Sequence, residues 1–317
     1  MKMSAARNFL EDRLGALPSP PDPRHYRVRS PILAEAEELP EEYDGLLEFH
    51  DLENWYDQGS VGSCCGWDGS IVMEVTGHLM DMKPEDLSAG WLYMKSREYA
   101  NIPPHIEGST NLGLMKALQK VGATTEECAP TDTSKPFEIK PCGNAMEIAK
   151  SYMIDSYWMG NTVPVDMQAA IYGLTHPAPY KMPDGSPGKI PLVTAYPVYE
   201  SFYDARNDGR VPLPVPGEKL LGGHSSMVRG WKIIDGEKYF INTNSWGSDW
   251  GIDGTNYLPF GYPFYDAWVI HNGPYTPPPD PDPYQPSTCV VARGYAGLGS
   301  GLSNALGRKS RFKAVIP

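Results

Sequence analysis

The sequence lacks a long apolar run of the kind that enters a membrane. No stretch approaches the roughly 20 apolar residues that a bilayer-spanning helix needs. At the N-terminus, Arg7, Glu11, Asp12 and Arg13 interrupt the apolar residues, whereas a secretory signal needs an unbroken apolar core. We therefore expect no membrane span and no secretory signal, and a location in the cytoplasm or within a viral particle.

Positive charge is also scarce. The chain has 27 Lys and Arg against 39 Asp and Glu, which gives a formal net charge of -12. A nucleic-acid-binding face has to neutralise phosphates with basic side chains, so this acidic excess argues against a nucleic-acid partner. A neutral or cationic partner is easier to accommodate.

Cysteine is the third scarce residue, with 5 in a chain of 317. Cys64 and Cys65 are neighbours, and disulfide geometry disfavours a bond between adjacent residues. The odd number, together with the missing secretory signal, favours a reducing compartment. We therefore expect no disulfide framework, and Cys128 with Cys142 is the example of a bridge that this interpretation disfavours.

Glycine and proline are abundant, with 32 of each, which predicts a loop-rich α+β protein. The length allows two lobes that share one site. Composition divides the chain into an extended Pro-rich arm (1–45), a main domain (46–273) and a Pro-rich linker with a Gly-rich basic tail (274–317). Apolar periodicity and stop signals predict helices at 8–17, 64–80, 88–99 and 111–121, and strands at 192–198, 225–234, 238–243 and 267–270.

Three residues stand where cysteine chemistry would need them. Cys64 follows a Gly/Ser-rich turn and begins a predicted helix, whose N-terminus favours a thiolate. Among seven histidines, His224 is distinct because it follows two glycines and opens a predicted strand. Asn244 ends the next strand, where its amide oxygen can orient an imidazole. Each of these three residues, taken alone, can also be an ordinary structural residue. The evidence for a catalytic site is therefore their combination.

Taken together, these segments resemble the papain family of cysteine peptidases. The matching segments are 58–64, Gly223-His224 and 244–247, and the similarity extends over roughly 46–270. The resemblance implies a two-lobe fold, with a helical left lobe, a β-barrel-like right lobe and the active site in the cleft between them. It implies an endopeptidase that acts on a peptide or protein substrate, with no cofactor and no metal.

The resemblance also assigns roles by position. Cys64 matches the nucleophile, His224 its base, Asn244 the orienting amide, and Gln58 the side chain that binds the oxyanion together with the Cys64 N–H. The residues expected to line the substrate site are Ser63, Cys65, Gly108, Ser109, Thr110, Gly223, Ser225 and Trp246.

Two positions depart from the family pattern. Val61 stands where many members have a disulfide cysteine, and Cys65 stands where tryptophan is usual. The second change places two thiols side by side. The spacing from Gln58 and the Gly-Ser pair before Cys64 favour Cys64 as the nucleophile.

Three alternatives stay open at this stage. The chain can be a structural or assembly component with a papain fold, for example in a virus or phage particle, with partners that contact its arm and tail. The N-terminal arm can be an inhibitory pro-segment, although such segments are generally longer and more helical than residues 1–42. An acyl transferase would use the same residues with an amine acceptor in place of water.

Overall fold

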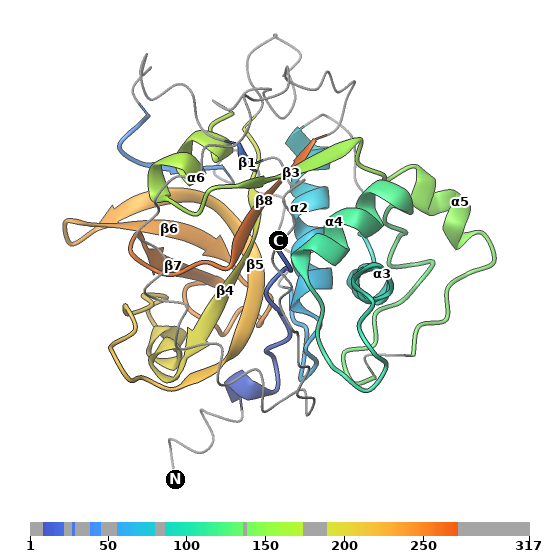
Figure 1. The fold of residues 1–317 in the computed structure, drawn as a ribbon, viewed down its shortest axis with the longest axis horizontal. Coiled ribbons are helices and arrows are strands. Elements are labelled where there is room, and N and C mark those ends of the chain that lie inside the picture. The colour runs from blue at the N-terminus through green and yellow to red at the C-terminus, as the bar shows by residue number, and fades with distance from the viewer. Residues whose placement is uncertain are drawn as a thin grey trace, which may run out of the picture. The chain divides into compact units, whose positions relative to one another are not determined.

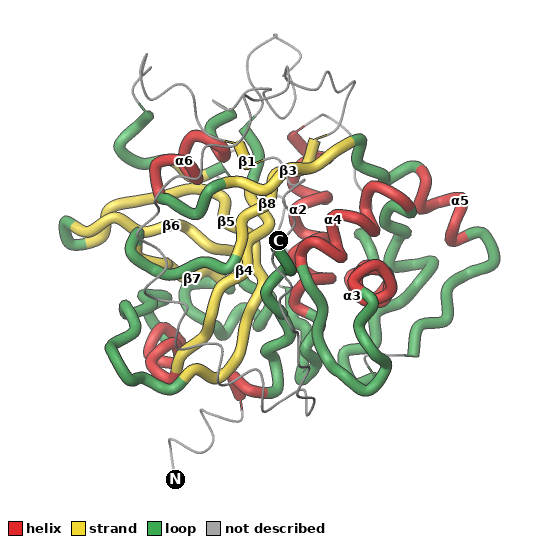
Figure 2. The backbone as a smooth tube through the Cα atoms, viewed as in Figure 1, coloured by secondary structure: helices red, strands yellow, loops and turns green. Residues whose placement is uncertain are grey.

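A computed structural model describes residues 9–21, 27–28, 39–45, 56–79, 86–135, 138–173 and 189–271. The chain forms two compact units, Met1–Thr276 and Pro277–Pro317, and the second lies outside the described residues. The predicted division into an arm, a main domain and a tail therefore stays a prediction. Within the first unit, Figures 1 and 2 show helices α2 to α5 on one side and most strands on the other.

The helical half follows the periodicity of the sequence closely. Its helices are α2 (Cys64–Leu79), α3 (Ala89–Ala100), α4 (Asn111–Lys120) and α5 (Ala145–Lys150). Ser88 and Thr110 cap α3 and α4 by accepting hydrogen bonds from the backbone N–H three residues on, which satisfies donors that a helix start leaves free. The three longest predicted helices are thus confirmed, and α5 is an addition.

The other half is a mainly antiparallel sheet in the order β1-β3-β8-β4-β5-β6-β7, with β2 paired to β5. Neither β1 nor β7 pairs with the other, so within the described residues the sheet is open rather than a closed barrel. A 3-10 helix, η2 (Glu200–Arg206), and α6 (Pro164–Ile171) complete this half. The strands are β1 (Arg27–Val28), β2 (Tyr43–Asp44), β3 (Ser156–Gly160), β4 (Leu192–Tyr199), β5 (Leu220–Ile234), β6 (Glu237–Thr243), β7 (Thr255–Pro259) and β8 (Asp266–His271).

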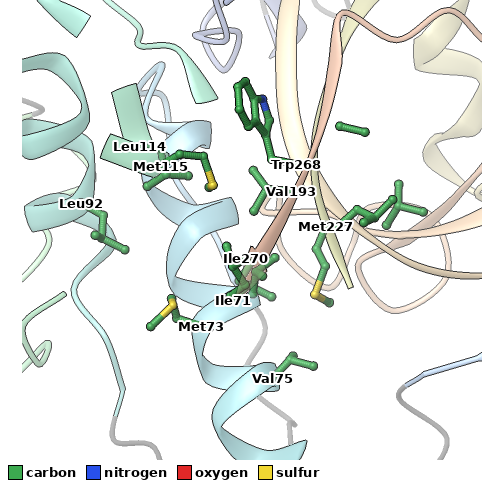
Figure 3. Packing of buried hydrophobic residues seen from close by; sticks show 14 of the residues in the cluster. Ile71, Met73, Val75, Leu92, Leu114, Met115, Val193, Met227, Trp268 and Ile270 are labelled. Carbon is green, nitrogen blue, oxygen red and sulfur yellow. The ribbon is translucent and has the colours of Figure 1, made fainter. Parts of the chain in front are cut away.

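Helix α2 joins the two halves, because its apolar residues pack toward both. Ile71 and Val75 are buried on this helix, as expected from their spacing. Figure 3 shows Ile71 close to Ile270 and the side chains of Val193 and Met227 reaching toward α2 from the sheet. Burying such side chains contributes about 1.5–3 kcal/mol each. The first residue of α2 is therefore placed rigidly beside the sheet.

Two expectations from the sequence are wrong. Cys128 and Cys142, 14 residues apart in sequence, form a disulfide with Cα atoms 5.0 Å apart. The Cys142 N–H also donates to the Cys128 carbonyl at 2.7 Å, so the two backbones lie side by side. Helical structure in 8–17 is limited to residues 9–11. The following backbone pairs with other segments instead, and Gly15 and Pro18 are poor helix formers. The expectations for residues 274–317 lie outside the described residues.

Candidate active site

The candidate nucleophile begins the central helix. Cys64 is the first residue of α2 and is fully buried. The turn before it bends at Gly59, whose φ of 62° lies in the left-handed region. A Cβ at this position would come within 2.8 Å of the Thr133 carbonyl oxygen, so glycine is required. This turn thereby places Gln58 and Cys64 in the same site.

The candidate base lies inside a long strand rather than at its mouth, where the sequence placed it. His224 belongs to β5 and is fully buried. Its Nε2 lies 2.8 Å from Oδ1 of Asn244. That oxygen also accepts a hydrogen bond from the Ser245 N–H at 2.7 Å. Because an amide oxygen only accepts, Nε2 carries the hydrogen, and Nδ1 is left for the thiol.

An indole covers this pair, as the resemblance implied. The ring centroids of Trp246 and His224 are 4.4 Å apart, and Trp246 packs edge-on against Trp250 at 4.5 Å. Both tryptophans are buried. Excluding water strengthens the hydrogen bond between His224 and Asn244, because the local dielectric constant is low.

The electrostatics of Cys64 favour the thiolate. Burial by itself would raise the pKa of Cys64. Hydrogen bonds from the Cys65 and His224 side chains, the positive charge of His224 and the Ser225 N–H outweigh that effect and hold the pKa well below its usual value. The pKa of Cys65 is raised, first by its hydrogen bond to Cys64 and then by burial. Of the two thiols, Cys64 is thus the one poised to ionise.

Gln58 presents an amide donor next to this thiol. Its side chain is fully buried, and Oε1 accepts a hydrogen bond from Ser245 Oγ at 2.7 Å. The Nε2 group donates to the Val61 carbonyl at 2.6 Å and to the Arg13 carbonyl at 2.8 Å. One N–H of Gln58 is therefore structural, and the other meets a carbonyl from the N-terminal arm.

The N-terminal arm passes through the site. We call residues 9–19 the strap; it is the dark blue segment that runs between the strands and α2 in Figure 1. The Ser109 N–H donates to the Gly15 carbonyl at 2.8 Å, the Leu17 N–H to the Ser109 carbonyl at 2.7 Å, and the Ala16 N–H to the Gly223 carbonyl at 3.0 Å. The strap thus pairs in parallel with Ser109.

Glycines make this close approach sterically feasible. A Cβ on Gly15 would lie 1.8 Å from the Gly62 carbonyl oxygen. A Cβ on Gly223 would lie 2.1 Å from the Ala16 carbonyl oxygen. Real Cβ atoms cannot be that close to backbone, so both glycines are needed for the strap to lie here.

The residues expected to bind substrate fall into two groups. Gly108, Ser109 and Gly223 contact the strap backbone, and Trp246 contacts Phe9 of the strap with ring centroids 6.1 Å apart. Cys65 packs against Ala16. The other three have structural partners. Ser63 accepts from the Gly66 N–H, Thr110 caps α4, and Ser225 Oγ contacts Asp68 Oδ2 at 2.7 Å.

Two buried carboxylates near the thiols, Asp68 and Asp266, are absent from the site residues expected from the sequence. Asp68 lies one turn after Cys64 on α2, and Asp266 begins β8; both are fully buried. Burial raises the pKa of Asp68 well above its usual value and that of Asp266 to about 6. The four-residue spacing of Cys64 and Asp68, which puts both on one helix face, was the sequence pattern that could have identified Asp68. No sequence pattern could have identified Asp266.

Beside the strap is a pocket of about 260 Å³, lined by Phe9, Arg13, Arg206, Trp246 and Trp250 among others. In the part of the chain that the structure describes, no group of three or more His, Cys, Asp or Glu side chains could hold a metal ion. Among the same residues, no helix is long and apolar enough to cross a membrane.

Comparisons with known proteins point to one family. The profile described as "Papain family cysteine protease" matches residues 192–261. An uncharacterized peptidase C1-like protein of Acanthamoeba polyphaga mimivirus is 27% identical over 232 residues, which cover 68% of this chain and 68% of that protein. The cathepsin B-like CP3 of Giardia intestinalis is 29% identical over 236 residues, covering 69% of each.

Solved structures agree in fold. Xylellain, a cysteine protease from Xylella fastidiosa, superposes with a TM-score of 0.67 at 23% identity, covering 83% of this chain and 97% of xylellain. ProCathepsin B S9 from Trypanosoma congolense has a TM-score of 0.63 at 16% identity, covering 84% and 89%. The two-lobe fold predicted from the sequence is confirmed. With the matched profile and relatives, this places the chain in the papain-like family of cysteine peptidases.

Proposed function

We propose that this peptidase hydrolyses peptide bonds through a thioester on Cys64, and that the strap blocks the site until it moves. The observation that carries this proposal is the position of the Arg13 carbonyl, which accepts a hydrogen bond from Gln58 beside a thiol of lowered pKa. A peptide carbonyl thus already lies at the donor that an oxyanion would use.

The chemistry follows from the roles of three side chains. The Cys64 thiolate attacks the carbonyl carbon, and the oxyanion is bound by Gln58 Nε2 and the Cys64 N–H at the start of α2. The protonated Nδ1 of His224 gives its proton to the leaving amine, which releases the C-terminal product. Water then attacks the thioester, His224 takes its proton, and the acid product leaves with Cys64 restored.

The strap runs in the direction opposite to a substrate. The leaving amine has to meet His224, so the C-terminal part of a substrate lies on the side of Trp246, and the acyl part lies along Ser109. In the strap, the N-terminal residue Phe9 contacts Trp246, and the C-terminal residue Leu17 pairs with Ser109. A reversed backbone occupies the site without presenting a cleavable bond in the reactive orientation.

The structural or assembly role has less support than hydrolysis. The matched relatives and solved structures carry the names of peptidases, which does not favour a purely structural or assembly role. Acyl transfer to an amine shares the thioester with hydrolysis, and only the acceptor differs.

The test is hydrolysis of an unfolded protein, such as casein, by the full chain and by Cys64→Ala, each with and without Gly15→Ala. The proposal predicts little activity in the wild type, more in Gly15→Ala, and none in either chain that carries Cys64→Ala. Activity that survives Cys64→Ala would contradict it.

A further inference from the structure

Helix α2 contacts strand β5 at two points that lie one helical turn apart. At the first, the sulfur of Cys64 accepts a hydrogen bond from the Ser225 N–H. At the second, Oδ2 of Asp68 lies 2.7 Å from Oγ of the same Ser225. Residues four apart lie on one face of a helix, so Cys64 and Asp68 face the same stretch of β5. Ser225 is therefore held through its backbone by the candidate nucleophile and through its side chain by a buried carboxyl group.

The contacts of the Ser225 hydroxyl need more hydrogens than the hydroxyl itself has. Its Oγ lies 2.7 Å from Asp68 Oδ2, 2.8 Å from Asn111 Oδ1 and 3.0 Å from the Thr194 carbonyl oxygen. A hydroxyl carries one hydrogen, and an amide or backbone carbonyl oxygen can only accept. Of these three neighbours, the carboxyl group alone can supply a second hydrogen. A neutral Asp68 that donates to Ser225 leaves the Ser225 hydrogen for the other two acceptors.

The orientation of Asn111 is fixed from its other end. Asn111 Nδ2 donates to Oδ1 of Asp266 at 3.1 Å, which turns the amide oxygen toward Ser225. Hydrogen bonds can then run in one direction, from Asp68 through Ser225 and Asn111 to Asp266. All four residues are fully buried, and such chains of hydrogen bonds strengthen one another where the dielectric constant is low. The network ties α2 to β5, α4 and β8.

The surroundings of Asp68 also suit a neutral acid. Its Oδ2 accepts from the Thr194 N–H at 3.2 Å, whereas Oδ1 has no hydrogen-bond partner in the described part of the chain. Among the same residues, no Lys, Arg or His forms an ion pair with Asp68. A buried carboxylate without a cation is far more costly than a neutral acid. Burial accordingly raises the pKa of Asp68 well above its usual value, which agrees with the count of hydrogens.

We propose that Asp68 is a positioning residue and a neutral carboxylic acid, which donates to Ser225 Oγ and thereby holds the Ser225 N–H on the sulfur of Cys64. Without Asp68, the hydroxyl would be held from the side of Asn111 and Thr194 alone. The first turn of α2 would lose its side-chain link to β5, and the hydrogen bond from Ser225 to the thiolate would lengthen. This inference rests on the proposed peptidase function, because it concerns how the same nucleophile is held.

The charge of Asp68 determines the sign of its effect on the thiol. As an anion, Asp68 would repel the thiolate and raise the pKa of Cys64. As a neutral donor to Ser225, it lowers the pKa of Cys64 by keeping the backbone N–H in place. Removal of Asp68 therefore has opposite effects in the two cases. The other titratable groups around it stay the same in each variant: Cys65 on α2, Tyr196 on β4, His224 on β5 and Asp266 on β8.

The test uses the full chain with Gly15→Ala as the parent, and adds Asp68→Ala or Asp68→Asn. It measures kcat and KM for a peptide and the pH dependence of Cys64 alkylation by iodoacetamide. In Asp68→Ala, the alkylation profile should shift to higher pH, and kcat should fall at least about tenfold with a much smaller change in KM. Asp68→Asn is uncharged and can still bond Ser225, so it should stay closer to the parent in both measurements.

A second variant covers the case in which Asp68→Ala does not fold. Ser225→Ala keeps the backbone N–H but removes the hydroxyl that Asp68 holds. It should shift the alkylation profile in the same direction as Asp68→Ala. Glu74→Ala is the matched control, because Glu74 is also a buried carboxyl group on α2 and bonds the Leu87 N–H and the Tyr56 hydroxyl. It should lower the melting temperature without moving the profile.

Three results would overturn the inference. A shift to lower pH in both Asp68 variants would show that Asp68 is an anion. An unchanged profile and kcat in Asp68→Ala would show that it does not position the thiol. Equal shifts in Asp68→Ala and Glu74→Ala would show a general effect of lost stability. A parent that hydrolyses no peptide would instead overturn the proposed function, and the alkylation profiles would still decide the role of Asp68.

Discussion

The Arg13 carbonyl oxygen accepts a hydrogen bond from Nε2 of Gln58 at 2.8 Å. Gln58 is the side chain that the proposed mechanism uses to bind the oxyanion, so the strap occupies the donor that catalysis needs. The strap makes these contacts largely through its backbone. Its affinity should therefore depend on close approach more than on the identity of its side chains.

Substitution of Gly15 should activate the enzyme. In Gly15→Ala, the new Cβ would lie 1.8 Å from the Gly62 carbonyl oxygen, so the strap cannot keep its position. We expect turnover of a peptide substrate by the full chain to rise by at least about tenfold, as a loss of about 1.4 kcal/mol in strap binding would produce. The initial rate at a fixed enzyme concentration measures it.

Gly143→Ala is the matched control. A Cβ at Gly143 has no atom within 4 Å, and the residue is far in sequence from the strap. Its rate should equal that of the wild type. Equal rates in Gly15→Ala and Gly143→Ala would show that the strap does not limit access.

Loss of Gln58 should reduce turnover more than binding. In the Gly15→Ala background, Gln58→Ala removes one donor to the oxyanion, which in comparable sites costs about 10²–10³ in kcat. KM should change much less, because the donor acts mainly on the transition state. Steady-state kinetics separate the two parameters. Gln119→Ala, at an exposed amide on α4, should retain normal kcat, and an unchanged kcat in Gln58→Ala would refute the assigned role.

Cys65 should tune the acidity of its neighbour. Its thiol is hydrogen-bonded to Cys64 and helps to lower the pKa of Cys64. In the Gly15→Ala background, Cys65→Ala removes this donor and should raise the pKa of Cys64, whereas Cys65→Ser keeps a donor and should leave it closer to the parent value. The rate of alkylation by iodoacetamide as a function of pH reports the thiolate. An identical pH profile in all three chains would show that Cys65 has no such influence.

Glu74 should make the fold less stable as the pH rises. Burial raises its pKa from 4.5 to about 7, against hydrogen bonds from the Leu87 N–H and the Tyr56 hydroxyl. Between pH 4.5 and 7, the unfolded chain releases this proton before the folded chain does. The contribution of Glu74 to stability is therefore full below this window and is lost as the pH rises through it, by roughly 3 kcal/mol.

Glu74→Gln removes this titration and keeps a side chain that can bond both neighbours. We expect a higher melting temperature than the wild type at pH 8 and a much smaller difference at pH 4. Glu237→Gln, at an exposed carboxylate that begins β6, serves as the control and should show no such pH-dependent gain. If Glu74→Gln and the wild type melt in parallel across this range, the buried carboxyl group is not the cause.

Parts of this site that depend on residues close together in the sequence can be predicted from it, and parts that depend on distant residues cannot. The spacing of Gln58 and Cys64, and the turn residues around His224 and Asn244, are local patterns, and the structure brings these four residues together. The path of the strap depends on Gly62 and Gly223, which lie far from Gly15 in sequence and carry no periodic signal. Asp266 enters the site only through the register of β8 against β4, which sequence does not reveal.

The disulfide illustrates the same limit. The number of cysteines carries no information on the distance between Cys128 and Cys142, and the expectation of a reducing compartment led to the wrong prediction for this pair. The two residues are 14 apart in sequence, and the path of the chain between them, which ends in a backbone hydrogen bond from Cys142 to Cys128, brings the two sulfurs together.

The most direct test of the account is the rate and position of labelling by a thiol-reactive peptidyl epoxide, followed by peptide mapping. The full wild-type chain, Gly15→Ala, and Gly15→Ala with Cys64→Ala are compared under the same conditions. The account predicts slow labelling of the wild type, fast labelling of Gly15→Ala on Cys64 alone, and none when Cys64 is absent. Labelling that moves to Cys65, or that proceeds at the same rate with and without Gly15→Ala, would contradict it.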